Sequence, residues 1–132
     1  MSAGYLVDTD WIIHWLNGHA AIGQRLEALR PQGLALSAIS LAGLYEGVYY
    51  SREPEHNERQ LRDALSGLTL LGVDFETCQI FGRERGRLRQ RRTLIADFDL
   101  LIGATALRHQ FTLLTNNRSD FEVLEGLQIE SG

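Results

Sequence analysis

Short apolar runs alternate with longer segments of helical periodicity along the chain, and this alternation restricts the fold more than any other feature. The run Tyr5 to Val7 is too short for a helix and has no polar position, which is typical of a strand buried on both faces. Strands separated by helices predict a parallel sheet with helices on both sides. The predicted strands are 5–7, 34–36, 70–73, 111–114 and 127–129.

Helices are predicted where apolar residues recur every three or four positions. The predicted helices are 11–16 with Asp10 as N-cap, 20–29, one from Ser37 or Ser40 to Tyr49, one that opens at Pro54, 76–90 and 100–107; residues 115–121 are predicted to form a polar loop. We therefore expect residues 1–132 to form one α/β domain, with a parallel sheet of four to five strands flanked by helices.

The charged residues exclude several classes of enzyme. The 13 basic residues are all arginine and stand against 17 acidic ones, which gives a net charge of −4. A chain without lysine cannot be a Schiff-base enzyme or a P-loop nucleotidase, because both need an ammonium group at a fixed position. Cys78 is the single cysteine and residues 1–8 lack the basic start of a signal peptide, so we expect a cytoplasmic protein.

Several oxygen-bearing side chains follow or precede predicted strands at one edge of the sheet. Asp8 follows the first strand, Asn117 and Asp120 follow the fourth, and Asp97 and Asp99 begin the helix before it. The carboxyl ends of parallel strands form the ligand-binding edge in such folds. Carboxylates without histidine or thiolate partners suit a hard divalent cation such as Mg²⁺ or Mn²⁺. The sequence therefore predicts a metal site at this edge.

Some of these acids also have a purely structural interpretation. Asp10 and Asp97 stand where helix caps are expected, since Asp accepts hydrogen bonds from free backbone N–H groups there. Asp120 can be an ordinary loop residue. Asp8 is harder to explain in this way, because a carboxylate directly after a buried strand has a desolvation cost that a cap two residues later does not account for.

Four segments occur in an order that resembles a known family. They are Leu6-Val7-Asp8-Thr9-Asp10, Leu36-Ser37-Ala38-Ile39-Ser40-Leu41-Ala42, Asp99-Leu100-Leu101-Ile102-Gly103-Ala104-Thr105-Ala106, and Leu113-Leu114-Thr115-Asn116-Asn117 with Asp120-Phe121. Together they resemble the PIN-domain ribonucleases, and most closely the VapC toxins of bacterial toxin–antitoxin pairs. Each motif is weak alone, but the four in register cover nearly the whole chain.

The resemblance implies an endoribonuclease that depends on Mg²⁺ or Mn²⁺ and hydrolyses RNA phosphodiesters to leave 5′-phosphate and 3′-hydroxyl ends. It implies that Asp8 and Asp99 bind the metal and that Asp97 is a supporting acid. The fourth acidic position falls on Asn117 or Asp120, because members of the family differ in this loop. The resemblance also implies a VapB-type antitoxin as partner.

One departure from the family pattern concerns the helix after the second strand. In similar toxins it reads Ile-Thr-Leu-Ala-Glu-Leu-Tyr-x-Gly, and its Glu is a site acid. Here Gly43 stands at that position and Glu46 lies one turn further on. Glycine inside a helix costs roughly 1 kcal/mol relative to Ala, so stability does not explain it. We expect an impaired nuclease, through a natural or an introduced change; the alternative is an inactive PIN domain that binds its antitoxin and operator DNA.

Two groups of residues have open interpretations. The arginines between Arg83 and Arg92 spread around a predicted helix, which favours a solvated face, and phosphate binding at the mouth of the groove is the alternative. Similar toxins form homodimers. The candidate aromatic contacts are Tyr45, Tyr49, Tyr50 and Trp11, with core packing as the alternative for Trp11. A phosphatase built on Asp8-Thr9-Asp10 is disfavoured, because such sites use a lysine.

Overall fold

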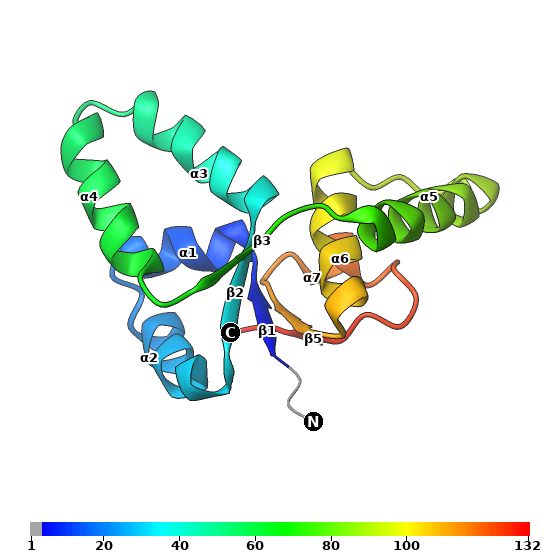
Figure 1. Cartoon of the computed structure of the whole chain (residues 1–132), viewed down its shortest axis with the longest axis horizontal. Coiled ribbons are helices and arrows are strands. Elements are labelled where there is room, and N and C mark those ends of the chain that lie inside the picture. Colours follow the sequence, from blue (N-terminus) through cyan, green and yellow to red (C-terminus); the bar gives the residue numbers. More distant parts are fainter. Residues whose placement is uncertain (1–3) are drawn as a thin grey trace.

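A computed structural model describes residues 4–132 (Figure 1). Residues 1–3, which belong to the N-terminal stretch considered above as unlike a signal peptide, lie outside the described residues. One sheet has the strand order β3-β2-β1-β4-β5, and every neighbouring pair is parallel. The strands are β1 (Tyr5–Val7), β2 (Leu34–Ser37), β3 (Thr69–Leu71), β4 (Thr112–Leu114) and β5 (Ile129–Glu130). The expected α/β fold is confirmed.

Helices flank the sheet on both sides. They are α1 (Thr9–Leu16), α2 (Ala20–Leu29), the 3₁₀ helix η1 (Arg30–Gln32), α3 (Ala38–Tyr49), α4 (Pro54–Leu65), α5 (Phe75–Gln90), α6 (Asp97–His109) and α7 (Arg118–Phe121). Figure 1 shows α1 to α4 on one side of the sheet and α5 to α7 on the other. Within residues 4–132, no helix combines the length and the apolar character that a membrane span needs.

The sheet separates two hydrophobic cores. Val7 packs with Leu36 of β2, with Trp11 and with other residues on the side of α1 to α4, whereas its neighbour Leu6 packs with Leu100 and others on the side of α5 to α7. Successive side chains of a strand point to opposite faces, so a strand covered on both faces must be apolar throughout. The central position of β1 between these cores places the residue after it, Asp8, in the middle of the sheet edge.

Several boundaries differ from those predicted. Asp8, and not Asp10, is the N-cap of α1, because its Oδ1 accepts a hydrogen bond from the Thr9 N–H at 2.8 Å. Asp97 lies inside the first turn of α6, whose N-cap is Ala96. A carboxylate in the first turn still interacts favourably with the helix dipole, so the sequence signal places an acid there without fixing the cap. The predicted polar loop also contains α7.

Candidate metal-binding site at the sheet edge

Asp8 is the most buried carboxylate at the carboxyl edge of the sheet, and only 3% of it is exposed. Its Oδ1 accepts from the backbone of Thr9, and its Oδ2 accepts from Thr115 Oγ1, each at 2.8 Å. Burial raises the pKa of the Asp8 carboxyl to about 6, and the charges of Asp10 and Asp99 add to that rise. The hydrogen bonds from Thr115 and Thr9 lower the pKa and offset part of it.

Thr115 is a site residue that the sequence reasoning missed. It follows β4, the strand paired with β1, and it is fully buried. Besides donating to Asp8, its Oγ1 accepts a hydrogen bond from the Asn117 N–H at 3.0 Å. A hydroxyl directly after an apolar strand was the available signal, but it becomes informative only when β4 is known to lie beside β1.

Asp10 is the second missed residue. Its Oδ2 accepts a hydrogen bond from the Asn116 N–H at 2.9 Å. The side-chain oxygen of Asn116 in turn accepts from Trp11 Nε1 at 3.0 Å and from the Gly132 N–H at 2.9 Å. The loop after β4 is therefore fastened both to α1 and to the last described residue, and this holds the Asp10 carboxylate at the same edge as Asp8.

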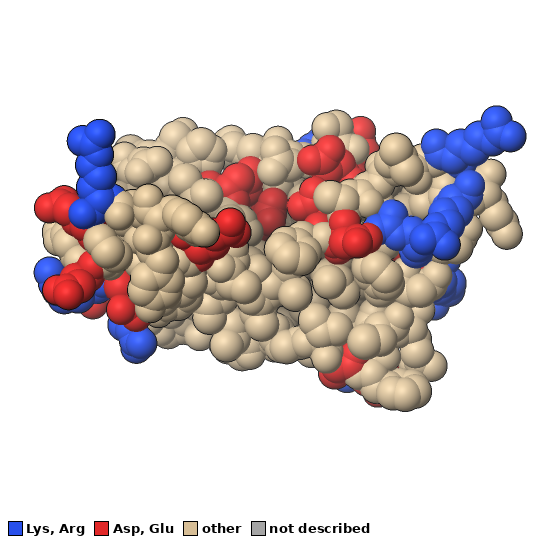
Figure 2. Space-filling model, turned by 90° about the horizontal axis from the view of Figure 1, so that it is seen from above, with Lys and Arg blue, Asp and Glu red and all other residues tan. Residues whose placement is uncertain are grey.

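Asp99 completes the group from the other side of the sheet. It lies half-buried in the first turn of α6, and burial raises the pKa of its carboxyl, with further contributions from the charges of Asp120 and Asp10. We call Asp8, Asp10, Asp99 and Asp120 the acidic cluster. Figure 2 looks down on the edge where the strands end and shows acidic side chains gathered along the middle of this hollowed face.

The remaining predicted site residues lie elsewhere. Asp97 is exposed, and its Oδ1 accepts a hydrogen bond from Arg85 Nη2 at 2.6 Å. Asn117 is exposed at the start of α7 and contacts Thr115 through its backbone. Glu46 is exposed on α3. The structure thus brings Asp8, Asp99 and Asp120 together and holds Asp97 in an ion pair.

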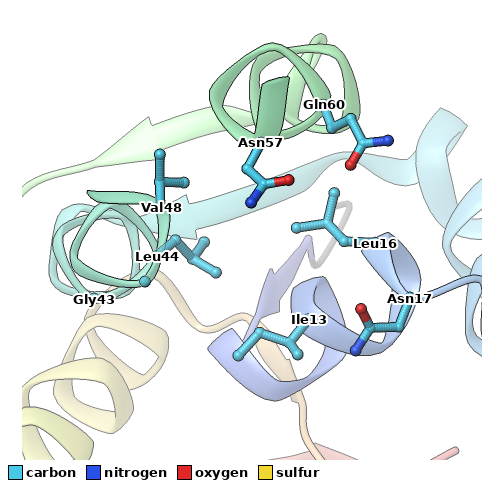
Figure 3. A pocket seen from close by; sticks show the side chains of 9 residues that line it. Ile13, Leu16, Asn17, Gly43, Leu44, Val48, Asn57 and Gln60 are labelled. Atoms are coloured by element: carbon cyan, nitrogen blue, oxygen red, sulfur yellow. The ribbon is translucent and has the colours of Figure 1, made fainter. Parts of the chain in front are cut away.

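Gly43 lines a groove of about 250 Å³ between α1, α3 and α4 (Figure 3). A Cβ atom built at Gly43 would meet no heavy atom of another part of the protein within 4 Å. Helix α3 contacts both α1 and α6, whose first turns carry Asp10 and Asp99. The groove is lined by Ile13, Leu16, Asn17, Gly43, Leu44, Gly47, Val48, Asn57 and Gln60, and Glu46 is not among these residues.

The donor chemistry of the acidic cluster fits a hard cation, although the described side chains do not form a closed site. Within residues 4–132, no three Asp, Glu, His or Cys side chains are arranged to hold a metal ion. In the same part of the chain, Asp10 Oδ1 is buried and has no hydrogen-bond partner. A cation near it would satisfy this oxygen and relieve the repulsion between neighbouring carboxylates, with water as the remaining ligands.

Comparisons with known proteins agree with this fold. The family described as "PIN domain" matches residues 5–127. Ribonuclease VapC2 of Rickettsia felis is 32% identical over 129 residues, 96% of each chain, and the tRNA(fMet)-specific endonuclease VapC of Salmonella typhimurium is 28% identical over 127 residues, again 96% of each. The crystal structure of VapBC2 from Rickettsia felis bound to a promoter DNA fragment matches with a TM-score of 0.92 and 31% identity, covering 97% of this chain and 98% of that one. The chain therefore belongs to the PIN-domain family and, within it, to the VapC ribonucleases of toxin–antitoxin systems.

Proposed function

We propose that this chain is a toxin that hydrolyses RNA phosphodiesters with Mg²⁺ or Mn²⁺ bound at the acidic cluster. The observation that carries the proposal is the meeting of Asp8, Asp10, Asp99 and Asp120 at one edge, where burial raises the pKa of Asp8 and of Asp99 and the charges of neighbouring carboxylates add to the rise. Such repulsion in a folded protein favours a divalent countercharge. The Salmonella relative is named for a tRNA substrate, which supports a structured RNA as the substrate class.

Asp8 and Asp99 would hold the ion, with Asp10 and Asp120 supporting them directly or through water. When bound, the ion lowers the pKa of a water molecule and offsets the charge that develops on the phosphate. Thr115 fixes the orientation of Asp8, and the Asn116 N–H fixes that of Asp10. In the hydrolysis, a water oxygen bonds to phosphorus, the bond from phosphorus to the 3′ oxygen breaks, and that oxygen leaves with a proton.

We further propose that the nuclease is impaired, because Gly43 stands on α3 where similar toxins carry a glutamate and supplies no carboxylate there. Glu46 is exposed one turn further along α3, and in this proposal it does not replace the missing carboxylate. The structural neighbour from Rickettsia felis is a VapBC complex, and this supports a VapB-type antitoxin as the partner of this chain.

Cleavage of a structured RNA in Mg²⁺ tests the proposed function. In a Gly43→Glu background, Asp99→Asn is expected to reduce cleavage by roughly 10²-fold or more, because a positioned acid contributes that much to catalysis. Asp97→Asn is the matched control and is expected to retain most of the activity, because Asp97 is exposed and paired with Arg85. Cleavage that persists in Asp99→Asn, or in excess chelator, would contradict the assignment.

Mn²⁺ binding is expected to depend on Asp8. In a titration followed by paramagnetic broadening of amide NMR signals, residues at the ends of β1 and β4 should broaden first, since Asp8 follows β1 and is hydrogen-bonded to Thr115, which follows β4. Asp8→Asn should abolish this effect because it removes the central carboxylate. An unchanged Mn²⁺ affinity in that variant would rule out Asp8 as a ligand.

We propose that the chain forms a homodimer through the end of α3. Tyr49 and Tyr50 are 66% and 86% exposed, which is unusual for large aromatic side chains. Trp11 is fully buried, so the interpretation of core packing is confirmed for it, and Tyr45 donates a hydrogen bond to Glu58 and stacks on Tyr49. Sedimentation at high micromolar concentration should show a dimer that Tyr49→Ser/Tyr50→Ser converts to the 14.9 kDa monomer. A monomer at every concentration would exclude the homodimer.

A further inference from the structure

The arginines of α5 and of the loop that follows it fall into two groups. Arg83, Arg85 and Arg87 form ion pairs within the protein, with Glu84 or Asp97. Arg89, Arg91 and Arg92 are exposed, and none of the ion pairs or side-chain hydrogen bonds found within residues 4–132 uses their guanidinium groups. The first group stabilises the fold, whereas the second leaves positive charge available in a protein whose net charge is −4.

Large apolar side chains lie exposed on the segment of the chain that follows these arginines. Leu94 is 93% exposed and Phe98 is 61% exposed. Arg89, Arg92 and Leu94 line one shallow hollow of about 650 Å³ at the junction of α5 and α6, together with the ion pair of Arg85 and Asp97, and Phe98 follows this lining directly in the sequence. Arg92 also has a φ of 55°, in the left-handed region that non-glycine residues rarely adopt. Proteins bind single-stranded nucleic acids by stacking bases on aromatic rings and pairing phosphates with guanidinium groups, and residues 89–98 carry exposed side chains of both kinds.

The residues that line the hollow are close in sequence to Asp99 of the acidic cluster, since the last of them is Asp97. Phe98 directly precedes Asp99, and Arg85 ties the first turn of α6 to α5 through Asp97. The chain from Arg92 to Asp99 can span at most about 25 Å. Figure 2 shows basic side chains at both ends of the molecule, on either side of the acidic side chains of the central hollow, and α5 occupies one of these ends in Figure 1. A polyanion that approaches carboxylates needs such a cationic anchor nearby.

We propose that Arg89, Arg92 and Phe98 form a subsite that holds a single-stranded segment of the RNA substrate beside the cleavage site. The guanidinium groups of Arg89 and Arg92 bind two phosphates, and the Phe98 ring stacks on a base. This inference rests on the proposed ribonuclease function. It adds which part of the RNA substrate is bound and which residues bind it. Arginine suits this role, because its planar group pairs with phosphate through two hydrogen bonds.

Binding of a fluorescent single-stranded RNA to the full chain, measured by anisotropy in EDTA, tests the subsite without any cleavage. Arg89→Gln/Arg92→Gln should weaken binding at least tenfold and lower the slope of log K against log salt by about 1.4, since each phosphate contact on a single strand contributes about 0.7. Phe98→Ala should weaken binding roughly tenfold with the slope unchanged, because stacking releases no counterions. All the changed side chains are exposed, so thermal unfolding should show that the variants remain folded.

Arg59→Gln is the control for the loss of a positive charge elsewhere on the surface, because Arg59 is exposed on α4 at the opposite end of the molecule. It should leave both the affinity and the salt slope unchanged. An equal loss in Arg59→Gln would overturn the subsite, and so would equal affinity for duplex DNA or an acidic peptide. Cleavage that requires Asp99 but is unaffected by the arginine and Phe98 variants would overturn this inference alone, whereas RNA binding through the subsite without Asp99-dependent cleavage would overturn the proposed function alone.

Discussion

Gly43→Glu is expected to raise the ribonuclease activity of this chain by roughly 10² to 10⁴-fold, the range that a positioned acid or base contributes. The added side chain would begin in open space, because a Cβ at this position meets nothing within 4 Å. It would bring a carboxylate to α3, which contacts both of the helices that carry Asp10 and Asp99. Replacing glycine inside a helix should also stabilise the protein by up to about 1 kcal/mol. Cleavage of a structured RNA in Mg²⁺, with growth arrest on expression, measures the effect.

Two controls separate charge from size and position. Gly43→Gln has nearly the same volume without the charge, so it should gain helix stability and little activity. Gly47→Glu is the control for position, because it places a carboxylate one turn further along the same groove, where a Cβ also has open space.

A fully active chain with Gly43 in place, together with an inactive Glu46→Gln, would show that Glu46 is the working acid. That result would mean that Gly43 does not occupy the position of the family's glutamate.

The alternation of strands and helices was predictable from the sequence because burial on both faces leaves no polar position inside a strand. Residues 20–29 and the start of α4 at Pro54 have the predicted bounds, since a proline and a regular apolar period mark them clearly. Strand β1 also has the predicted bounds, whereas the ends of the other short strands shifted by one or two residues, as in β3, which ends at Leu71 and not at Val73. Hydrogen bonds to a neighbouring strand decide where such a strand ends, and the sequence does not name that neighbour.

The acidic cluster was predictable only in part. Asp8 and Asp99 stand out because each carboxylate adjoins an apolar element, and the structure brings them together. From its sequence context, Asp10 is interpreted as a helix cap. Its place in the site depends on the hydrogen bond from the Asn116 N–H, 106 residues away along the chain. The separation of Asp97 from the cluster depends on Arg85, which lies on another helix. Contacts of this kind follow from the strand order β1-β4 and the packing of α5 on α6, which no local pattern contains.

Asp8→Asn is expected to stabilise the metal-free protein at pH 8 and not at pH 4. The pKa of the buried Asp8 carboxyl is about 6 in the folded protein against 3.8 for an ordinary aspartate, so folding favours the protonated form. The contribution of the protonated Asp8 carboxyl to the free energy of unfolding is fully present below about pH 4 and is lost as the pH rises through 6. A rise of about two pKa units corresponds to about 3 kcal/mol in the free energy of unfolding. Asparagine cannot ionise, yet it caps a helix as well as aspartate does.

Thermal unfolding in EDTA should therefore show the melting temperature of Asp8→Asn above that of the unaltered chain by on the order of 10 °C at pH 8, and a much smaller gap at pH 4. Exposed Asp63 on α4 provides a control of equal charge, and Asp63→Asn should leave the pH dependence unchanged. Mg²⁺ at pH 8 should reduce the difference in melting temperature between Asp8→Asn and the unaltered chain. It should stabilise only the chain that retains Asp8, because a ligand that binds the folded state raises its stability. A gap of equal size at both pH values would mean that the Asp8 carboxyl ionises as readily in the folded protein as in the unfolded one.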